Sequence, residues 1–124
     1  MRIAIAVFLA LHGFAHFVGF AGSFGLAESI PYKTTVLGGT VDLGDAGIRA
    51  FGMLWLVAGG AFLVASAAAM TSQEWWVKAL LVAATSSLVL SLMALPEAKV
   101  GVLLNLLILA AVGVWRMGWL PARI

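Results

Sequence analysis

Two long stretches without a charged side chain place the strongest constraint on how this chain folds. Residues 3–27 and residues 50–73 contain no Asp, Glu, Lys or Arg, and each exceeds the roughly 20 apolar residues that cross a bilayer core. Two shorter uncharged stretches, 79–95 and 100–115, reach that length if Lys78 and Arg116 extend their side chains toward the lipid headgroups. The sequence therefore predicts four transmembrane helices, at about 2–24, 46–70, 73–95 and 97–119.

The overall composition excludes a water-soluble domain. Hydrophobic residues make up 64% of the 124 residues and charged residues 10%, whereas soluble domains average about 45–50% and 25%. The net charge of +2 comes from scattered side chains near the helix ends, so the chain has no basic patch for nucleic acid. The absence of cysteine excludes disulfides and thiolate chemistry.

The connections predict an all-α integral membrane four-helix bundle with up-down-up-down order and both termini on the same side. One domain, 1–124, uses the whole chain. The segment 25–45 is longer than the usual helix connection of about 2–8 residues, so we expect it to fold over one mouth of the bundle. Asp42 or Asp45 is placed to cap the second helix.

Two turn signals predict the borders of the third helix. Thr71 and Glu74 have the spacing of a capping box, which predicts a helix that begins directly after a short turn. Pro96 disfavours helical geometry in the residue before it, so the third helix is expected to end at Leu95. Pro96 and Glu97 are suited to the first turn of the fourth helix.

Small and polar residues predict which helix faces meet, because helices in lipid associate through close approach and interhelical hydrogen bonds. Such residues recur at spacings of three, four or eight on each helix: His12, Ala15, His16, Gly19 and Ser23 in the first, Ala61, Ala65 and Ala69 in the second, Ser87 and Ser91 in the third, and Gly101, Asn105 and Gly113 in the fourth. We expect these faces to turn inward.

His12 and His16 are the most informative candidates for chemistry, because ionisable side chains at bilayer depth are expensive. Three interpretations stay open. The pair could contribute to a metal or haem site, although such a site needs further ligands. A histidine could serve as a proton relay or general base. The third interpretation is structural, with neutral imidazoles bonded to Asn105, the serines of the third helix or backbone carbonyls.

Asn105 and Glu97 are the remaining candidate site residues. An amide in the middle of an apolar helix commonly joins helices, and it can also bind a substrate. Glu97 lies beside Pro96 and Lys99, which is typical of a solvated turn, but it could also face the bundle mouth as an acid.

Motifs over nearly the whole chain resemble small bacterial four-helix membrane proteins related to DoxX. The resemblance rests on Arg2, on Leu-His-Gly-x-x-His-x-x-Gly-Phe at 11–20, and on Leu-Pro-x-Ala-Lys-x-Gly-x-x-x-Asn at 95–105. It implies a four-helix bundle in a bacterial inner membrane, with family links to redox-associated membrane complexes.

The charge distribution predicts the orientation. One side carries Arg2, Lys78, Arg116 and Arg123, and the other carries Lys33, Arg49 and Lys99 with most of the acids. Because positive charge favours the cytoplasmic side, both termini are expected in the cytoplasm.

Three functions are compatible with these features. The leading interpretation is an accessory membrane protein in which His12, His16, Asn105 and Glu97 bind a small lipid-like or quinone-like molecule. The alternatives are a transporter or channel made of several copies, and an intramembrane lipid-modifying enzyme with a His/Glu pair. The sequence assigns no catalytic residue, metal ligand or cofactor. The expected partners are the lipid bilayer and further copies of the chain or a larger membrane complex, but not nucleic acid.

Overall fold

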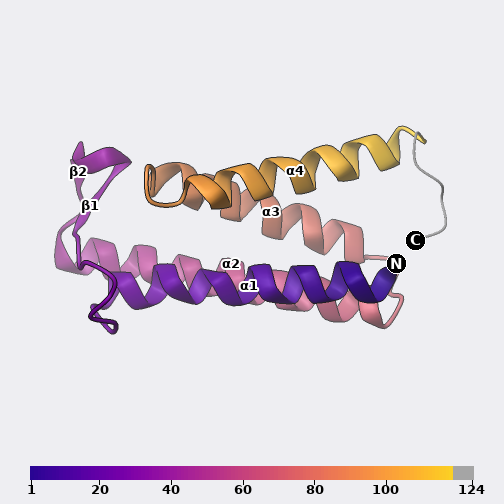
Figure 1. Ribbon diagram of the computed structural model, residues 1–124, viewed down its shortest axis with the longest axis horizontal. Coiled ribbons are helices and arrows are strands. Elements are labelled where there is room, and N and C mark those ends of the chain that lie inside the picture. Colours follow the sequence, from indigo (N-terminus) through magenta and orange to yellow (C-terminus); the bar gives the residue numbers. More distant parts are fainter. Residues whose placement is uncertain (119–124) are drawn as a thin grey trace.

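The computed structural model describes residues 1–118, and these form four main helices (Figure 1). The helices are α1 (Arg2–Ser23), α2 (Gly44–Met70), α3 (Trp76–Met93) and α4 (Lys99–Arg116). All four are long and apolar enough to cross a membrane, which confirms the expected all-helical membrane architecture. The expected end of the fourth helix at 119 and the charge of Arg123 lie outside the described residues.

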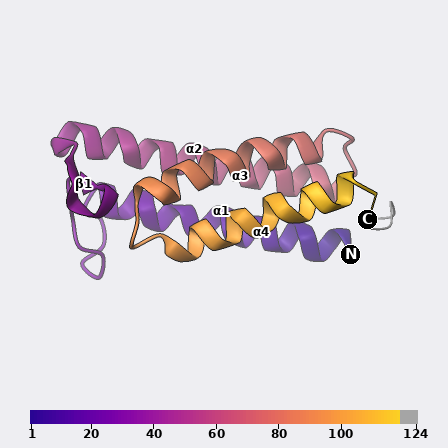
Figure 2. The same ribbon diagram turned by 90° about the horizontal axis from the view of Figure 1, so that it is seen from above.

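Neighbours in sequence are neighbours in space. Helix α1 packs on α2, α2 on α3, and α3 on α4, whereas α1 and α4 have few close backbone approaches. Helix α4 is the most peripheral, since 11% of its apolar window is buried against 44% for α2. Figure 1 shows α4 on the far side of α3 from α2, and Figure 2 gives the same arrangement from above. The bundle is therefore open along a seam between α1 and α4.

Polar contacts tie the connections together at the two ends. The Arg2 guanidinium donates to the hydroxyl of Ser72 in the turn between α2 and α3. At the opposite end, the Gly38 N–H donates to the Leu95 carbonyl over 2.9 Å, which joins the long loop to the turn between α3 and α4. Figure 1 shows this grouping of the connections at the two ends.

The predicted capping box at Thr71 and Glu74 is wrong. Thr71 ends α2, and its hydroxyl donates back to the Ala67 carbonyl over 2.8 Å. Helix α3 begins only at Trp76, with no side-chain cap. The reason is that the hydroxyl of Thr71 is already used by the helix that ends there, so it does not reach the amides of the next one.

The predicted borders at Pro96 are also wrong. Helix α3 ends at Met93 and α4 starts at Lys99, so Pro96 and Glu97 belong to the turn. Pro96 has no N–H to donate, and the Leu95 carbonyl accepts from the loop instead of from a helical amide. The backbone of this turn therefore bonds to the loop as well as to both helices.

The long loop contains a small ribbon. Strands β1 (Thr35–Val36) and β2 (Val41–Asp42) pair antiparallel, with the 3-10 turn η1 (Leu37–Gly39) between them. Val36 is buried in a cluster that includes Ile48, Phe51 and Trp55 of α2. This contact holds the loop against the end of the bundle.

Neither aspartate expected as the cap of α2 occupies the N-cap, which is Leu43. Asp42 accepts the N–H of Gly44, the first residue of the helix, over 3.0 Å. Asp45 lies in the first turn, where a negative charge is favourable, and it accepts the hydroxyl of Tyr32 over 2.5 Å.

Glycine permits the close packing of α1 on α2. A Cβ on Gly59 would lie 2.8 Å from the Gly13 carbonyl oxygen, and a Cβ on Gly19 would lie 2.5 Å from the Trp55 ring. Close approach of this kind is typical of helix pairs in membranes. Most of the stripe expected on α1 does turn inward, but Ala15 is exposed, because it faces the open seam.

Candidate functional site

Three of the four predicted site residues meet in the middle of the bundle. His12 and His16 of α1 are 7% and 4% exposed, and Asn105 of α4 is fully buried. Ser87 of α3 is also fully buried and completes the group. Three helices thus contribute to one polar cluster, which we define as His12, His16, Ser87 and Asn105.

Hydrogen bonds link the cluster in a closed circuit. His16 Nδ1 lies 2.8 Å from the His12 carbonyl oxygen, and His16 Nε2 lies 2.7 Å from Ser87 Oγ. Asn105 Nδ2 donates to Ser87 Oγ over 2.7 Å, and Asn105 Oδ1 lies 3.3 Å from His12 Nε2. These are the kinds of partner expected for the structural interpretation of the two histidines.

The proton positions in this circuit follow from chemistry. A carbonyl oxygen only accepts, so Nδ1 of His16 carries a proton, and in the neutral ring Nε2 accepts from Ser87. Ser87 has then used its only proton, so the Asn105 amide NH₂ must face it. The Asn105 oxygen consequently faces His12, whose Nε2 donates. Each of these four contacts then pairs one donor with one acceptor, and neither ring needs a charge.

Aromatic rings enclose the two histidines. The His12 and Phe62 rings meet edge to face with centroids 4.6 Å apart. The His16 ring lies 5.4 Å from the Trp55 ring, and Phe62 has no exposed surface. The polar cluster is therefore shielded by apolar side chains of α2.

A cavity of about 740 Å³ extends from this cluster toward the loop end of the bundle. His12, His16 and Ser87 form part of its lining, and Phe51 and Trp55 contribute aromatic walls. Most other lining residues are apolar or glycine. Val18 of α1 and Val100 of α4 line it at the seam, and both side chains are more than half exposed. The cavity is thus adjacent to the outer surface of the helices.

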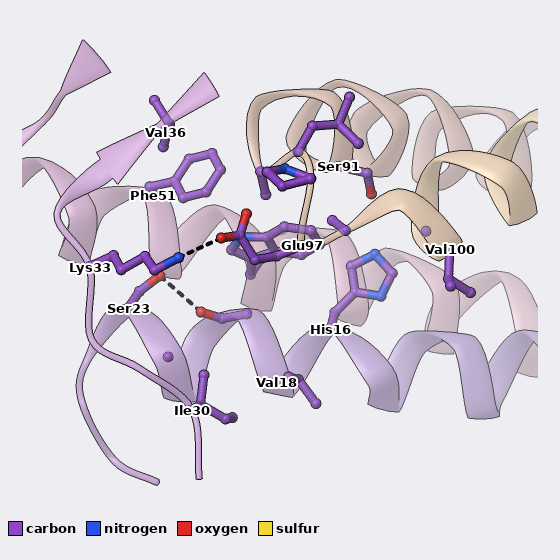
Figure 3. Close-up of a pocket in the computed structure, with 18 of the residues that line it drawn as sticks. His16, Val18, Ser23, Ile30, Lys33, Val36, Phe51, Ser91, Glu97 and Val100 are labelled. Carbon is purple, nitrogen blue, oxygen red and sulfur yellow. Dashed lines mark hydrogen bonds and ion pairs between the residues drawn. The ribbon is translucent and has the colours of Figure 1, made fainter. Parts of the chain in front are cut away.

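Glu97 lines the same cavity but lies at its mouth. Its carboxylate pairs with the ammonium group of Lys33 over 2.6 Å, and both side chains are more than half exposed. The hydrogen bond from Lys33 lowers the pKa of the Glu97 carboxyl below its usual value. Figure 3 shows this pair between the loop and the α3–α4 turn, with His16 on α1 nearby.

The sequence reasoning assigned no function to Ser91, Lys33 and the aromatic wall. The sequence places Ser91 in the small-residue stripe of the third helix and among the serines that could bond to the histidines, and it places Lys33 among the charges opposite the termini. The useful signal was the length of the loop, because a loop that folds over the bundle mouth brings its lysine to the turn that carries Glu97. No local signal in the sequence separates Ser91 from Ser87.

Among residues 1–118, no group of three or more His, Asp or Glu side chains is arranged to hold a metal ion. Searches against protein-family models, curated proteins and solved structures found no match to this chain. The cavity and the polar cluster are therefore the features of this chain that point to a function.

Proposed function

We propose that this chain is an accessory protein of a bacterial inner membrane, related to DoxX, that binds one small lipid-like or quinone-like molecule in its cavity. Its helices cross the membrane in up-down-up-down order, with both termini in the cytoplasm. The observation that carries the proposal is the cavity of about 740 Å³ between apolar walls and a buried polar cluster. Ligand pockets usually have volumes of about 300–1,000 Å³ and this kind of lining.

The open seam supports entry from the bilayer. Helices α1 and α4 have few close backbone approaches, and the cavity reaches Val18 and Val100 on their exposed sides. At the loop end, the ribbon and the Lys33–Glu97 pair cover the mouth. An apolar molecule dissolved in the membrane would reach the cavity through the seam without crossing water.

The hydrogen bonding supports binding over catalysis. Both ring nitrogens of His16 have partners within 2.8 Å, so this imidazole has no free site for abstracting a proton from a substrate. The Glu97 carboxylate is paired with Lys33. An enzyme that uses His16 with Glu97 would need both groups to exchange these partners for a substrate.

Native mass spectrometry of the detergent-purified protein tests the proposal. We expect a retained molecule at one per chain, and the same spectra report the copy number. Val18→Trp places an indole beside the cavity at the seam and should reduce the retained ligand strongly. Val7→Trp is the matched control, because Val7 is a similarly exposed valine of α1 that does not line the cavity.

A wild-type protein that carries no bound molecule, and that binds none of a set of added apolar amphiphiles, would refute the proposal. Equal loss of ligand in Val18→Trp and Val7→Trp would also count against it, because the effect would then not depend on the cavity.

A further inference from the structure

The Ser91 hydroxyl is the exceptional polar group of the cavity. Ser91 is 1% exposed and lines the cavity, yet its Oγ has no hydrogen-bond partner among the described residues. Buried hydroxyls nearly always have a partner, and one left unpaired costs about 1–3 kcal/mol. This hydroxyl therefore needs an explanation.

Other hydroxyls on these helices have hydrogen-bond partners. Ser23, Thr71 and Ser86 each donate to the carbonyl four residues earlier, over 2.8 Å. Ser87 bonds to His16 and Asn105. Ser91 does neither, although it stands one turn after Ser87 on the same face of α3.

Glycine on α4 leaves room for this hydroxyl. A Cβ on Gly101 would lie 2.8 Å from Ser91 Oγ, so a larger residue there would press on the hydroxyl. Both residues line the cavity. Figure 3 shows the Ser91 hydroxyl on the side of α3 that faces the start of α4, with His16 on α1 beyond it. The unpaired group thus lies in the cavity lining, beside the space that Gly101 leaves open.

The charge of the lining restricts the ligand further. Among the described lining residues, the charged side chains are Lys33 and Glu97, and these neutralise each other at the mouth. The polar cluster deeper in the bundle is bonded within itself. A charged ligand group beside Ser91 would have no counterion and would be expensive to bury.

We propose that Ser91 is the polar anchor of the cavity and that the ligand is an uncharged, largely apolar molecule whose oxygen accepts the Ser91 hydrogen bond. A carbonyl or a hydroxyl oxygen supplies this chemistry. The inference rests on the proposed function, because it defines the ligand of the same cavity. His16 and the polar cluster then shape the site, while Ser91 supplies its free hydrogen-bonding group.

Three probes of equal chain length test this inference: 2-tetradecanone, tetradecane and tetradecanoate. Each is titrated into the delipidated full-length protein in detergent, and occupancy is read by native mass spectrometry. We expect the ketone to bind about 3- to 10-fold more tightly than the alkane, which is the range for one net hydrogen bond. The carboxylate should bind less tightly than the ketone.

Ser91→Ala should remove the preference for the ketone and leave alkane binding unchanged. Ser86→Ala is the control, because Ser86 lies on the same helix, is exposed and bonds to its own helix. Gly101→Ala should weaken ketone binding as well, because its new Cβ meets Ser91 Oγ. Circular dichroism checks that each variant retains the wild-type helix content.

The outcomes separate this inference from the proposed function. If ketone and alkane bind equally, or if Ser91→Ala keeps the ketone preference, the role of Ser91 is refuted while the cavity still binds. Tightest binding of tetradecanoate would overturn the uncharged class. Failure of all three probes to bind would overturn both proposals.

Discussion

Replacing Asn105 by Leu tests the polar cluster most directly. Leu has nearly the shape of Asn but no polar atoms, so packing changes little while the hydrogen bonds disappear. Asn105 is fully buried and joins α4 to both α1 and α3 through His12 and Ser87. Since α4 is the least buried helix, these bonds should contribute to holding α4 against α1 and α3.

The expected loss follows from the bonds removed. Two side-chain hydrogen bonds end at Asn105, and each contributes about 0.6–1.5 kcal/mol in membrane and soluble proteins. The His12 N–H is also left without its acceptor, which costs about 1 kcal/mol or more. Asn105→Leu should therefore lower the free energy of unfolding by about 2–4 kcal/mol.

The assay is unfolding by sodium dodecyl sulfate in mixed micelles, followed by circular dichroism. Ser87→Ala also removes two side-chain hydrogen bonds, those to His16 and Asn105, so it alone should cost about 2–4 kcal/mol by the same reasoning. In the double variant the shared bond is counted once, so the total should fall below the sum by about 0.5–1.5 kcal/mol. A change within about 0.5 kcal/mol of wild type for Asn105→Leu, the usual range for surface substitutions, would refute the reasoning.

Two further predictions concern packing and charge. Gly59→Ala should destabilise the protein by about 1–3 kcal/mol, because the new Cβ would lie 2.8 Å from the Gly13 carbonyl oxygen. Gly60→Ala is the control, because a Cβ on Gly60 would have open space around it. This variant should be neutral or slightly stabilising in the same unfolding assay. The Glu97 carboxyl should titrate below its ordinary value of 4.5, because Lys33 favours the charged form. The ion pair is therefore fully present above pH 4.5, the ordinary pKa of the carboxyl, and it is lost as the pH falls through the lowered pKa. Lys33→Met should return the pKa toward its ordinary value in a carbon-13 NMR titration, and an unchanged pKa would contradict the pairing.

Part of the candidate site was predictable, because burying its polar side chains inside apolar helices costs free energy unless they find hydrogen-bond partners. Two histidines and an asparagine inside uncharged helices require partners, and the small set of polar residues at the same depth limits the choice. His12 and His16 do bond to Asn105, to a serine of α3 and to a backbone carbonyl. Glu97 was harder to place, because its partner Lys33 lies on a loop whose path no local pattern determines.

The borders of the helices were less predictable than their existence. Thr71 could serve either the end of one helix or the start of the next, and the local pattern does not distinguish the two. The same holds for Pro96, where the result depended on the contact between Gly38 and Leu95. At Thr71 the hydroxyl bonds to the Ala67 carbonyl of the helix that ends there, whereas at Pro96 a group distant in sequence takes part.

The sequence alone determined the four apolar helices, because hydropathy and length are local properties of each segment, and they decide whether it is stable in the bilayer core. It also determined which polar side chains must find partners inside them. Only the tertiary structure decided that α1 and α4 have few close backbone approaches, that a cavity lies beside their seam, and that the buried Ser91 hydroxyl lacks a partner among the described residues. These features depend on how each helix is rotated and spaced against the others, and no single helix contains that information.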